Sequence, residues 1–130
     1  MVVVRQHRHP ERAWTLELPG GIIDANEGVS EAGIREGAEE SGIQLSPDSK
    51  ITLMPVYRPN VGCSAEFVAT VRVTNVEPLP QSEAQKAICE RVLLSPEEFV
   101  QAIARGEIHD GHSLACFAYA VAASNQKLVF

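Results

Sequence analysis

The chain has 130 residues, of which 45% are hydrophobic and 22% charged, which is the balance of a folded domain rather than of a disordered segment. Its length suits one compact domain, residues 1–130, whose core needs no help from disulfides. The formal net charge of -6 excludes the basic surface that holds nucleic acid through its phosphates, so an anionic small molecule would need cationic side chains or a metal ion close by.

The cysteines and the apolar runs bear on the compartment. The 3 cysteines have no paired spacing, which favours buried thiols in a reducing compartment over a disulfide framework or a zinc site. Residues 1–4 are followed at once by Arg5, so this apolar stretch is too short for a signal peptide. The longest apolar run, residues 114–123, is too short to span a bilayer. We therefore expect a cytoplasmic protein without a membrane partner.

Two strands and a helix are predicted in the first third of the chain. Residues 2–4 and 14–18 have strand character, and the polar segment between them contains Pro10, which predicts a hairpin. Residues 30–41 are predicted to form a helix. Gly42 follows at the position where a left-handed residue ends many helices.

The middle of the chain is predicted to alternate strands with a loop. Residues 51–57 indicate a strand near a sheet edge, because Pro55 cannot donate to a sheet ladder. Residues 65–76 alternate apolar and polar side chains, as a half-buried strand does. The polar, proline-containing segment 78–86 is predicted to be a loop, and residues 88–94 return to strand character.

Two helices are predicted to end the chain. Ser95 and Glu98 form a capping box, and the helix that they begin should run to about residue 105, before Gly106. Residues 112–123 carry an apolar stripe with helical spacing. Strands interleaved with three helices predict an α/β fold in which a mixed sheet is covered on both faces, an α/β/α sandwich.

An acidic cluster in the first helix carries the chemical signal. Glu36, Glu39 and Glu40 have the spacing i, i+3, i+4, so their carboxylates share one helix face and repel one another. Arg35 can pair with Glu39 but neutralises only one charge. A hard divalent cation with oxygen ligands, magnesium or manganese, would balance the rest. For three glutamates taken alone, a solvated acidic face is the commoner arrangement.

The residues around this cluster resemble the signature of the Nudix hydrolase family. The pattern is Gly21, five residues, Glu27, seven residues, Arg35-Glu36, two residues, Glu39-Glu40, one residue, Gly42-Ile43. Agreement by chance at so many fixed offsets is remote. Residues 4–8, 17–24 and 106–108 are also similar to the branch of ADP-ribose and related nucleoside diphosphate sugar pyrophosphatases.

The resemblance implies a metal site on the box, residues 21–43, which in this family forms a loop and a helix. It implies that Glu36 and Glu40 are the principal ligands, that Glu39 is a direct or water-mediated ligand, and that the Gly20 carbonyl is a backbone ligand. Magnesium, or manganese, is the implied cofactor.

Four further residues of the box are implied to be structural. Glu27 and Arg35 resemble the pair that braces the loop against the helix, and the alternative is an ordinary surface salt bridge. Gly21 and Gly42 are the fixed glycines of the pattern.

The implied reaction is attack of water at phosphorus in a nucleoside diphosphate linked to another group. ADP-ribose would give AMP and ribose 5-phosphate. Arg5 and Arg8 are candidate contacts to phosphate or base, although solvated surface arginines are equally consistent with the sequence. The alternatives are a hydrolase of another sugar nucleotide or of a nucleoside triphosphate, and a Nudix-fold module that binds nucleotides without catalysis.

Three features depart from the branch. Gly37 replaces an aliphatic residue and Gly33 lies one turn earlier, and each glycine weakens a helix by about 1 kcal/mol. In this branch several dozen residues that contribute to a homodimer precede the first strand, whereas this sequence starts almost on that strand, as a short Nudix domain or a truncated one would. Members of the branch also supply a glutamate from a loop as catalytic base or metal ligand. Glu83 is the better candidate for this role and Glu90 is the other candidate, and a third option is that neither residue fills it.

Overall fold

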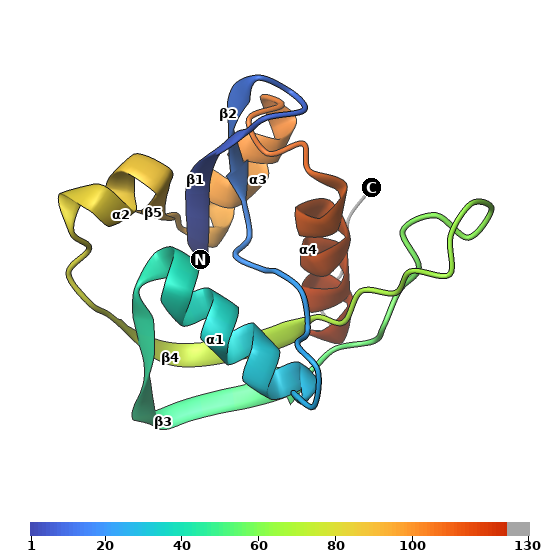
Figure 1. The fold of residues 1–130 in the computed structure, drawn as a ribbon, viewed down its shortest axis with the longest axis horizontal. Helices are drawn as coiled ribbons and strands as arrows, with labels where there is room; N and C mark the ends of the chain where they lie inside the picture. The colour runs from blue at the N-terminus through green and yellow to red at the C-terminus, as the bar shows by residue number, and fades with distance from the viewer. Residues whose placement is uncertain (125–130) are drawn as a thin grey trace.

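The computed structural model describes residues 1–124, except for the side chains of residues 83 and 84. Helices and strands alternate along the chain (Figure 1), which confirms the α/β class. The elements are β1 (Val2–Arg8), β2 (Ala13–Glu17), α1 (Val29–Ser41), β3 (Ile43–Leu53), β4 (Val71–Pro78), α2 (Glu83–Ile88), β5 (Cys89–Leu93), α3 (Pro96–Ala104) and α4 (Gly111–Ala123). None of the described helices is long and apolar enough to cross a membrane.

One sheet has three antiparallel strands in the order β2-β1-β5. The predicted hairpin is present as β1 and β2, and β5 pairs with the other edge of β1. One face of this sheet is covered by α3, because Val3 of β1 and Phe99 of α3 are fully buried in the same core cluster. Phe117 of α4 packs on Phe99, with ring centroids 4.9 Å apart.

Helix α1 lies at the opposite face of the same sheet. Successive strand residues point to opposite faces, so Val4 faces away from Val3 and shares its face with its register partners Glu17 and Arg91. Arg91 donates to the carbonyl oxygen of Ser41 at the end of α1. The three-stranded sheet thus lies between helices, as an α/β/α arrangement requires.

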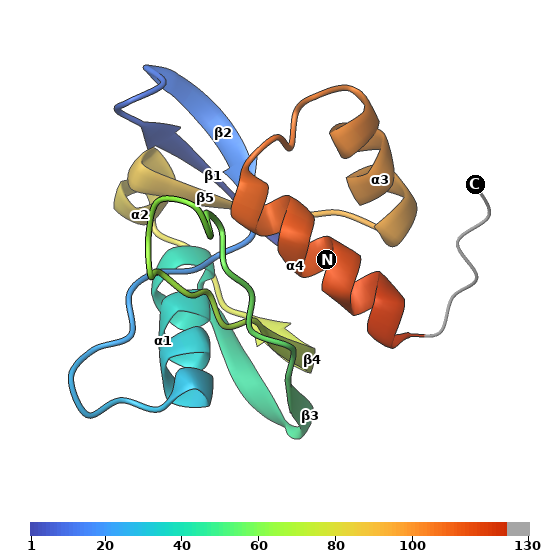
Figure 2. The same cartoon turned by 90° about the vertical axis from the view of Figure 1, so that its right-hand side faces the viewer.

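The second sheet has two antiparallel strands, β3 and β4. Helix α1 packs on it as well, so α1 contacts both sheets. Figure 2 shows β3, β4 and α1 in one half of the molecule and the three-stranded sheet with α3 in the other. Among the described strands every pairing is antiparallel, which differs from the single mixed sheet expected from the sequence. Alternation along a strand indicates that the strand exists but carries no information on its partners.

The middle of the chain departs most from its predicted boundaries. Strand β3 begins at Ile43, with a register shift between Leu45 and Lys50, and ends before Pro55. Strand β4 begins only at Val71. A short helix, α2, occupies part of the predicted loop 78–86. Ser82 and Gln85 form its capping box. This local helix signal was present in the sequence, but the prolines of the segment led to the prediction of a loop.

Candidate active site

Helix α1 carries the acidic cluster, and its two interior glycines lie where the helix meets its neighbours. A Cβ on Gly33 would lie 2.8 Å from Val71 Cγ2 of β4, and a Cβ on Gly37 would lie 3.2 Å from Ile43 Cδ1. Gly33 therefore allows a close approach of helix and strand. The Ile43 side chain lies beside Gly37 at a distance that a Cβ would already make tight, so a larger aliphatic residue would have to displace it.

Arg35 joins the loop before α1 to the helix. Its Nε and Nη2 donate to the Glu27 carboxylate at 2.8 and 2.9 Å, and Nη2 also donates to the Ile22 carbonyl oxygen at 3.0 Å. Nη1 donates to Glu36 Oε1 at 2.7 Å. The hydrogen bonds from Arg35 lower the pKa of Glu27 to about 2, and the same bonds raise the pKa of Arg35. The structure thus brings together the two residues that the sequence paired as a brace.

Glu36 lies against the glycine pair at the start of the loop. Its side chain is 16% exposed, and Gly21 leaves the space that the carboxylate occupies. A Cβ at position 21 would stand 2.6 Å from Glu36 Oε2 and closer still to Oε1. Gly21 is therefore required by the position of the carboxylate next to it.

Glu40 is held by the same loop. Its Oε2 accepts a hydrogen bond from the Gly20 N–H at 2.9 Å. Burial is the main cause that raises the pKa of Glu40, and the neighbouring charge of Glu36 raises it further. Glu39, in contrast, points outward with a side chain that is 60% exposed, 3.5 Å from Arg35. The loop therefore engages two of the three carboxylates.

The donor set of this site suits a hard cation. Carboxylate and carbonyl oxygens are the ligands that magnesium and manganese prefer. A cation between Glu36 and Glu40 would offset the repulsion that raises the pKa of Glu40. Within the part of the chain that the structure describes, no three acidic, histidine or cysteine side chains are gathered as a ready-made metal cluster. Glu36 accepts from Arg35 with Oε1 and Glu40 accepts from the Gly20 N–H with Oε2, and the second oxygen of each carboxylate could bind a cation while these bonds are kept.

A buried carboxylate, Glu17, was missed in the sequence and faces the same side of the sheet as α1. Glu17 is 5% exposed and accepts from Arg8 Nε at 2.9 Å, from Arg8 Nη2 at 2.5 Å and from Thr15 Oγ1 at 2.5 Å. Burial acts to raise the pKa of Glu17, but the hydrogen bonds from Arg8 and Thr15 outweigh it and lower the pKa. The charges of Arg8 and Glu17 act on Glu40. Alternation along β2, which puts Thr15 and Glu17 on one face, was the signal available in the sequence.

Arg5 and Glu90 lie on the other face of the sheet. They are register partners on β1 and β5, and Arg5 Nη1 lies 3.6 Å from Glu90 Oε2. The Arg5 guanidinium also stacks over Trp14, 5.4 Å from the ring centroid. The structure therefore does not bring Arg5, a predicted substrate contact, to the carboxylates of α1, because strand alternation turns it away from Arg8. The same argument separates Glu90 from the site.

The other loop candidate is Glu83, at the start of α2. Its side chain lies outside the described residues. The base role assigned to Glu83 therefore stays a prediction.

A large cavity adjoins the site. It has a volume of about 1310 Å³ and is lined by residues of both halves of the molecule. Its wall includes Arg8, Glu17, Gly20, Gly21, Glu36 and Asp110. This cavity is large enough for a nucleotide with an attached sugar.

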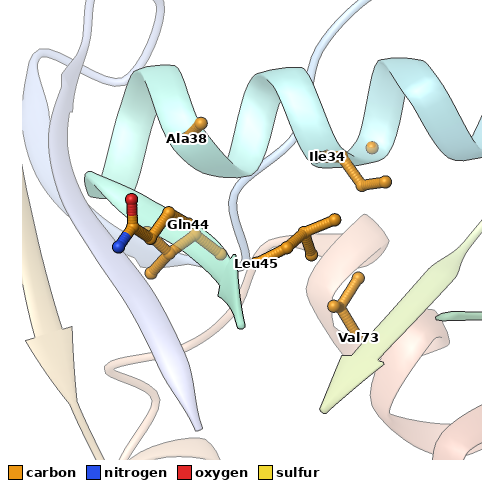
Figure 3. A pocket seen from close by; sticks show the side chains of 7 residues that line it. Ile34, Ala38, Gln44, Leu45 and Val73 are labelled. Carbon is orange, nitrogen blue, oxygen red and sulfur yellow. The ribbon is translucent and has the colours of Figure 1, made fainter. Parts of the chain in front are cut away.

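A smaller pocket of about 220 Å³ lies between α1, β3 and β4 (Figure 3). Ile34, Ala38, Leu45 and Val73 make it apolar, and Gln44 is the polar side chain at its edge. It has no charged group to hold a phosphate, so the larger cavity is the better candidate for a nucleotide site.

Comparison with known proteins fits this geometry. Residues 1–115 match the model of the NUDIX domain family. The protein named "Putative nudix hydrolase 2" from Caenorhabditis elegans is 50% identical over 88 residues, which are 65% of this chain and 38% of that protein. The chain thus matches well under half of the length of this relative. Because the family model covers most of the chain, the chain belongs to the Nudix family.

Proposed function

We propose that this protein hydrolyses the pyrophosphate bond of a nucleoside diphosphate linked to another group, with ADP-ribose as the substrate. AMP and ribose 5-phosphate are the products. Family membership supports hydrolysis of nucleoside diphosphate-linked compounds in general. The choice of ADP-ribose is supported by the similarity of residues 4–8, 17–24 and 106–108 to that branch of the family.

The observation that carries the proposal is the position of two acidic side chains of α1 against one loop. Glu36 lies against Gly21 at the wall of the 1310 Å³ cavity, and Glu40 accepts from the N–H of Gly20, which belongs to the same wall. Glu36 and Glu40 offer carboxylate oxygens to a divalent cation, and the Gly20 carbonyl and Glu39, directly or through water, complete the proposed ligand set. Nudix hydrolases generally use divalent metal ions, and we assign magnesium, with manganese as a substitute.

The residues around the carboxylates have separate tasks. Arg35 holds Glu36 and the loop in one arrangement, so the carboxylate is oriented before substrate arrives. Arg8, half-exposed and fixed by Glu17, presents a cation to the cavity that can pair with a phosphate oxygen. A bound metal ion supplies charge neutralisation at the diphosphate and a more acidic water. Glu83 is proposed as the base that accepts a proton from the attacking water.

Incubation with a panel of nucleotides in magnesium tests the proposal. We expect ADP-ribose to be cleaved fastest, chelation to abolish turnover, and Glu40→Gln to lower turnover by several orders of magnitude. Glu97→Gln, exposed on α3, is the matched control and should leave turnover unchanged. Metal-free protein that still hydrolysed its best substrate at the untreated rate would overturn the metal mechanism.

The same panel separates the alternatives. Faster cleavage of another sugar nucleotide or of a nucleoside triphosphate would change the substrate and keep the chemistry. Binding without cleavage of any nucleotide would indicate a nucleotide-binding module. Hydrolysis in oxygen-18 water should label a phosphate product, and a label confined to the sugar hydroxyl would exclude attack at phosphorus. The cytoplasmic location and a homodimer stay predictions.

A further inference from the structure

The last turn of α1, which carries Glu40, is held by side chains from outside the helix. The final carbonyl oxygens of an α-helix have no partner within the helix. Here the Glu40 carbonyl oxygen accepts from Gln81 Nε2 at 3.3 Å. The carbonyl oxygens of Ser41 and Gly42 accept from Arg91 Nη1 at 2.8 and 3.1 Å. Three consecutive carbonyls are therefore satisfied by two side chains.

Gln81 and Arg91 also hold each other. The Arg91 N–H donates to Gln81 Oε1 at 2.9 Å, and Gln81 Nε2 donates to the Cys89 carbonyl oxygen at 3.2 Å. Arg91 Nη1 reaches the Leu79 carbonyl oxygen at 2.8 Å. The amide and the guanidinium thus tie the end of α1 to β5 and to the segment before α2. We call Gln81 and Arg91 the C-terminal clamp of α1.

Gly42 makes room for this clamp. Its φ of 61° is left-handed, and a Cβ there would lie 3.3 Å from Gln81 Cγ and 3.4 Å from Arg91 Nη1. The glycine of the box is therefore needed for two reasons, backbone conformation and close approach of the two side chains.

Electrostatics explain why the clamp includes a cation. The C-terminal end of a helix carries partial negative charge, and carboxylates there are unfavourable. Helix α1 has Glu39 and Glu40 in its last turns and no basic residue of its own there. Arg91 brings the missing positive charge from β5.

We infer that Gln81 and Arg91 are positioning residues that keep the Glu40 carboxylate where it can ligate the metal. The inference rests on the proposed function, in which Glu40 is a ligand. Without the clamp the last turn frays, and Glu40 loses its fixed place beside the Gly20 N–H. Residues that orient metal ligands typically contribute about 10–100-fold in metal affinity, and we expect that loss when the clamp is removed.

The test measures binding of Mn²⁺ alone, from the electron paramagnetic resonance signal of the free ion. Gln81→Met keeps the length of its side chain, Arg91→Met keeps an unbranched apolar stem, and both remove the hydrogen bonds, so both should raise the Kd for Mn²⁺ by about 10–100-fold. Arg91→Lys should bind more tightly than Arg91→Met, because one nitrogen makes all three contacts of Arg91 to carbonyl oxygens and an ammonium can replace it. Arg105→Met, which breaks an exposed ion pair with Glu107, is the matched control and should match the wild type.

Activity gives a second readout that a general loss of stability would not reproduce. At saturating Mn²⁺, Arg91→Met should regain most of the wild-type kcat with an unchanged KM for nucleotide, at a temperature where circular dichroism shows it folded. If Arg91→Met does not fold, the Kd values of Gln81→Met and Arg91→Lys for Mn²⁺ test the inference instead. Wild-type Kd values in Gln81→Met and in every folded Arg91 variant would overturn the inference. Mn²⁺ binding that Glu40→Gln leaves intact would instead contradict the proposed metal site itself.

Discussion

The Glu36 carboxylate occupies the space in which a side chain at position 21 would begin. A Cβ on Gly21 would lie 2.6 Å from Glu36 Oε2, well inside van der Waals contact. The atoms in the way are the far end of a flexible side chain, so Gly21→Ala should displace the carboxylate rather than unfold the loop. We therefore expect turnover to fall steeply while the free energy of unfolding changes little.

Steady-state kinetics and urea unfolding of Gly21→Ala measure the two effects. Gly62→Ala, in an exposed loop where a Cβ meets only Asn60 Oδ1 at 4.0 Å, is the matched control. A Gly21→Ala protein with wild-type kcat would show that Glu36 need not occupy this place during turnover.

Glu17→Gln tests the cluster that fixes Arg8. The Glu17 carboxylate is almost fully buried and accepts from Arg8 and Thr15. A glutamine cannot accept with both terminal atoms, so one of these donors loses its partner, at a cost of about 1–3 kcal/mol in the free energy of unfolding. Because Arg8 is half-exposed, we expect the lower part of that range. Unfolding by urea measures it, and an unchanged midpoint in Glu17→Gln would contradict the expectation.

Gly33→Ala should destabilise the protein although alanine is the better helix former. The new methyl group would lie 2.8 Å from Val71 Cγ2 and 2.9 Å from Val71 Cβ, so the strand or the helix must shift. Overpacking of this kind costs about 1–3 kcal/mol, more than the roughly 1 kcal/mol gained in helix propensity. A Val71→Ala background removes the contact with Cγ2 but keeps the one with Cβ, so the same substitution should cost less there than in the wild type. Thermal unfolding of the single and double variants measures how Gly33→Ala changes the free energy of unfolding in both backgrounds.

The ion pair between Glu27 and Arg35 predicts a dependence of stability on pH. Hydrogen bonds from Arg35 lower the pKa of Glu27 in the folded state to about 2, from an ordinary value of 4.5. A lowered folded-state pKa stabilises the protein above the unfolded-state value, and this contribution is lost as the pH falls towards 2. Urea unfolding should show the wild type losing stability relative to Glu27→Gln over that window. Parallel curves for the two proteins between about pH 5 and pH 2 would contradict the pairing.

Glu83→Gln should lower kcat and leave the Mn²⁺ Kd largely intact, if Glu83 is the base. A general base contributes about 10²–10⁴-fold to turnover. Glu90→Gln should keep the wild-type kcat, because Glu90 faces Arg5 on the far side of the sheet. Loss of turnover in Glu90→Gln alone would show that the wrong glutamate was chosen. Wild-type turnover in both variants would mean that no loop carboxylate is needed.

Local signals in the sequence predicted much of the fold. The hairpin, the left-handed end of α1 at Gly42 and the capping box at Ser95 were all predicted, and the structure confirms them. Each is decided by residues within a few positions of one another. The separation of the strands into two sheets was not predicted, because pairing depends on contacts between segments distant in the chain.

In the candidate site, too, features that depend on nearby residues were predicted and features that depend on distant segments were not. Spacing along one helix placed Glu36 and Glu40 on a common face. Glu17 was missed because its charged partner, Arg8, comes from a neighbouring strand and its own segment gave no charge pattern. Arg91 was missed for a similar reason: its role depends on carbonyl oxygens at the end of a helix that lies about fifty residues earlier in the chain.

Helix α1 packs on both sheets, and these sheets share no strand. Any motion that widens or narrows the cavity between the two halves must therefore bend or carry α1. That helix bears Glu36 and Glu40, so the width of the large cavity and the position of the two carboxylates are mechanically coupled. A ligand that draws the halves together would therefore shift the proposed metal ligands without touching them, and the fit of the distant end of a substrate would be transmitted to the reacting end.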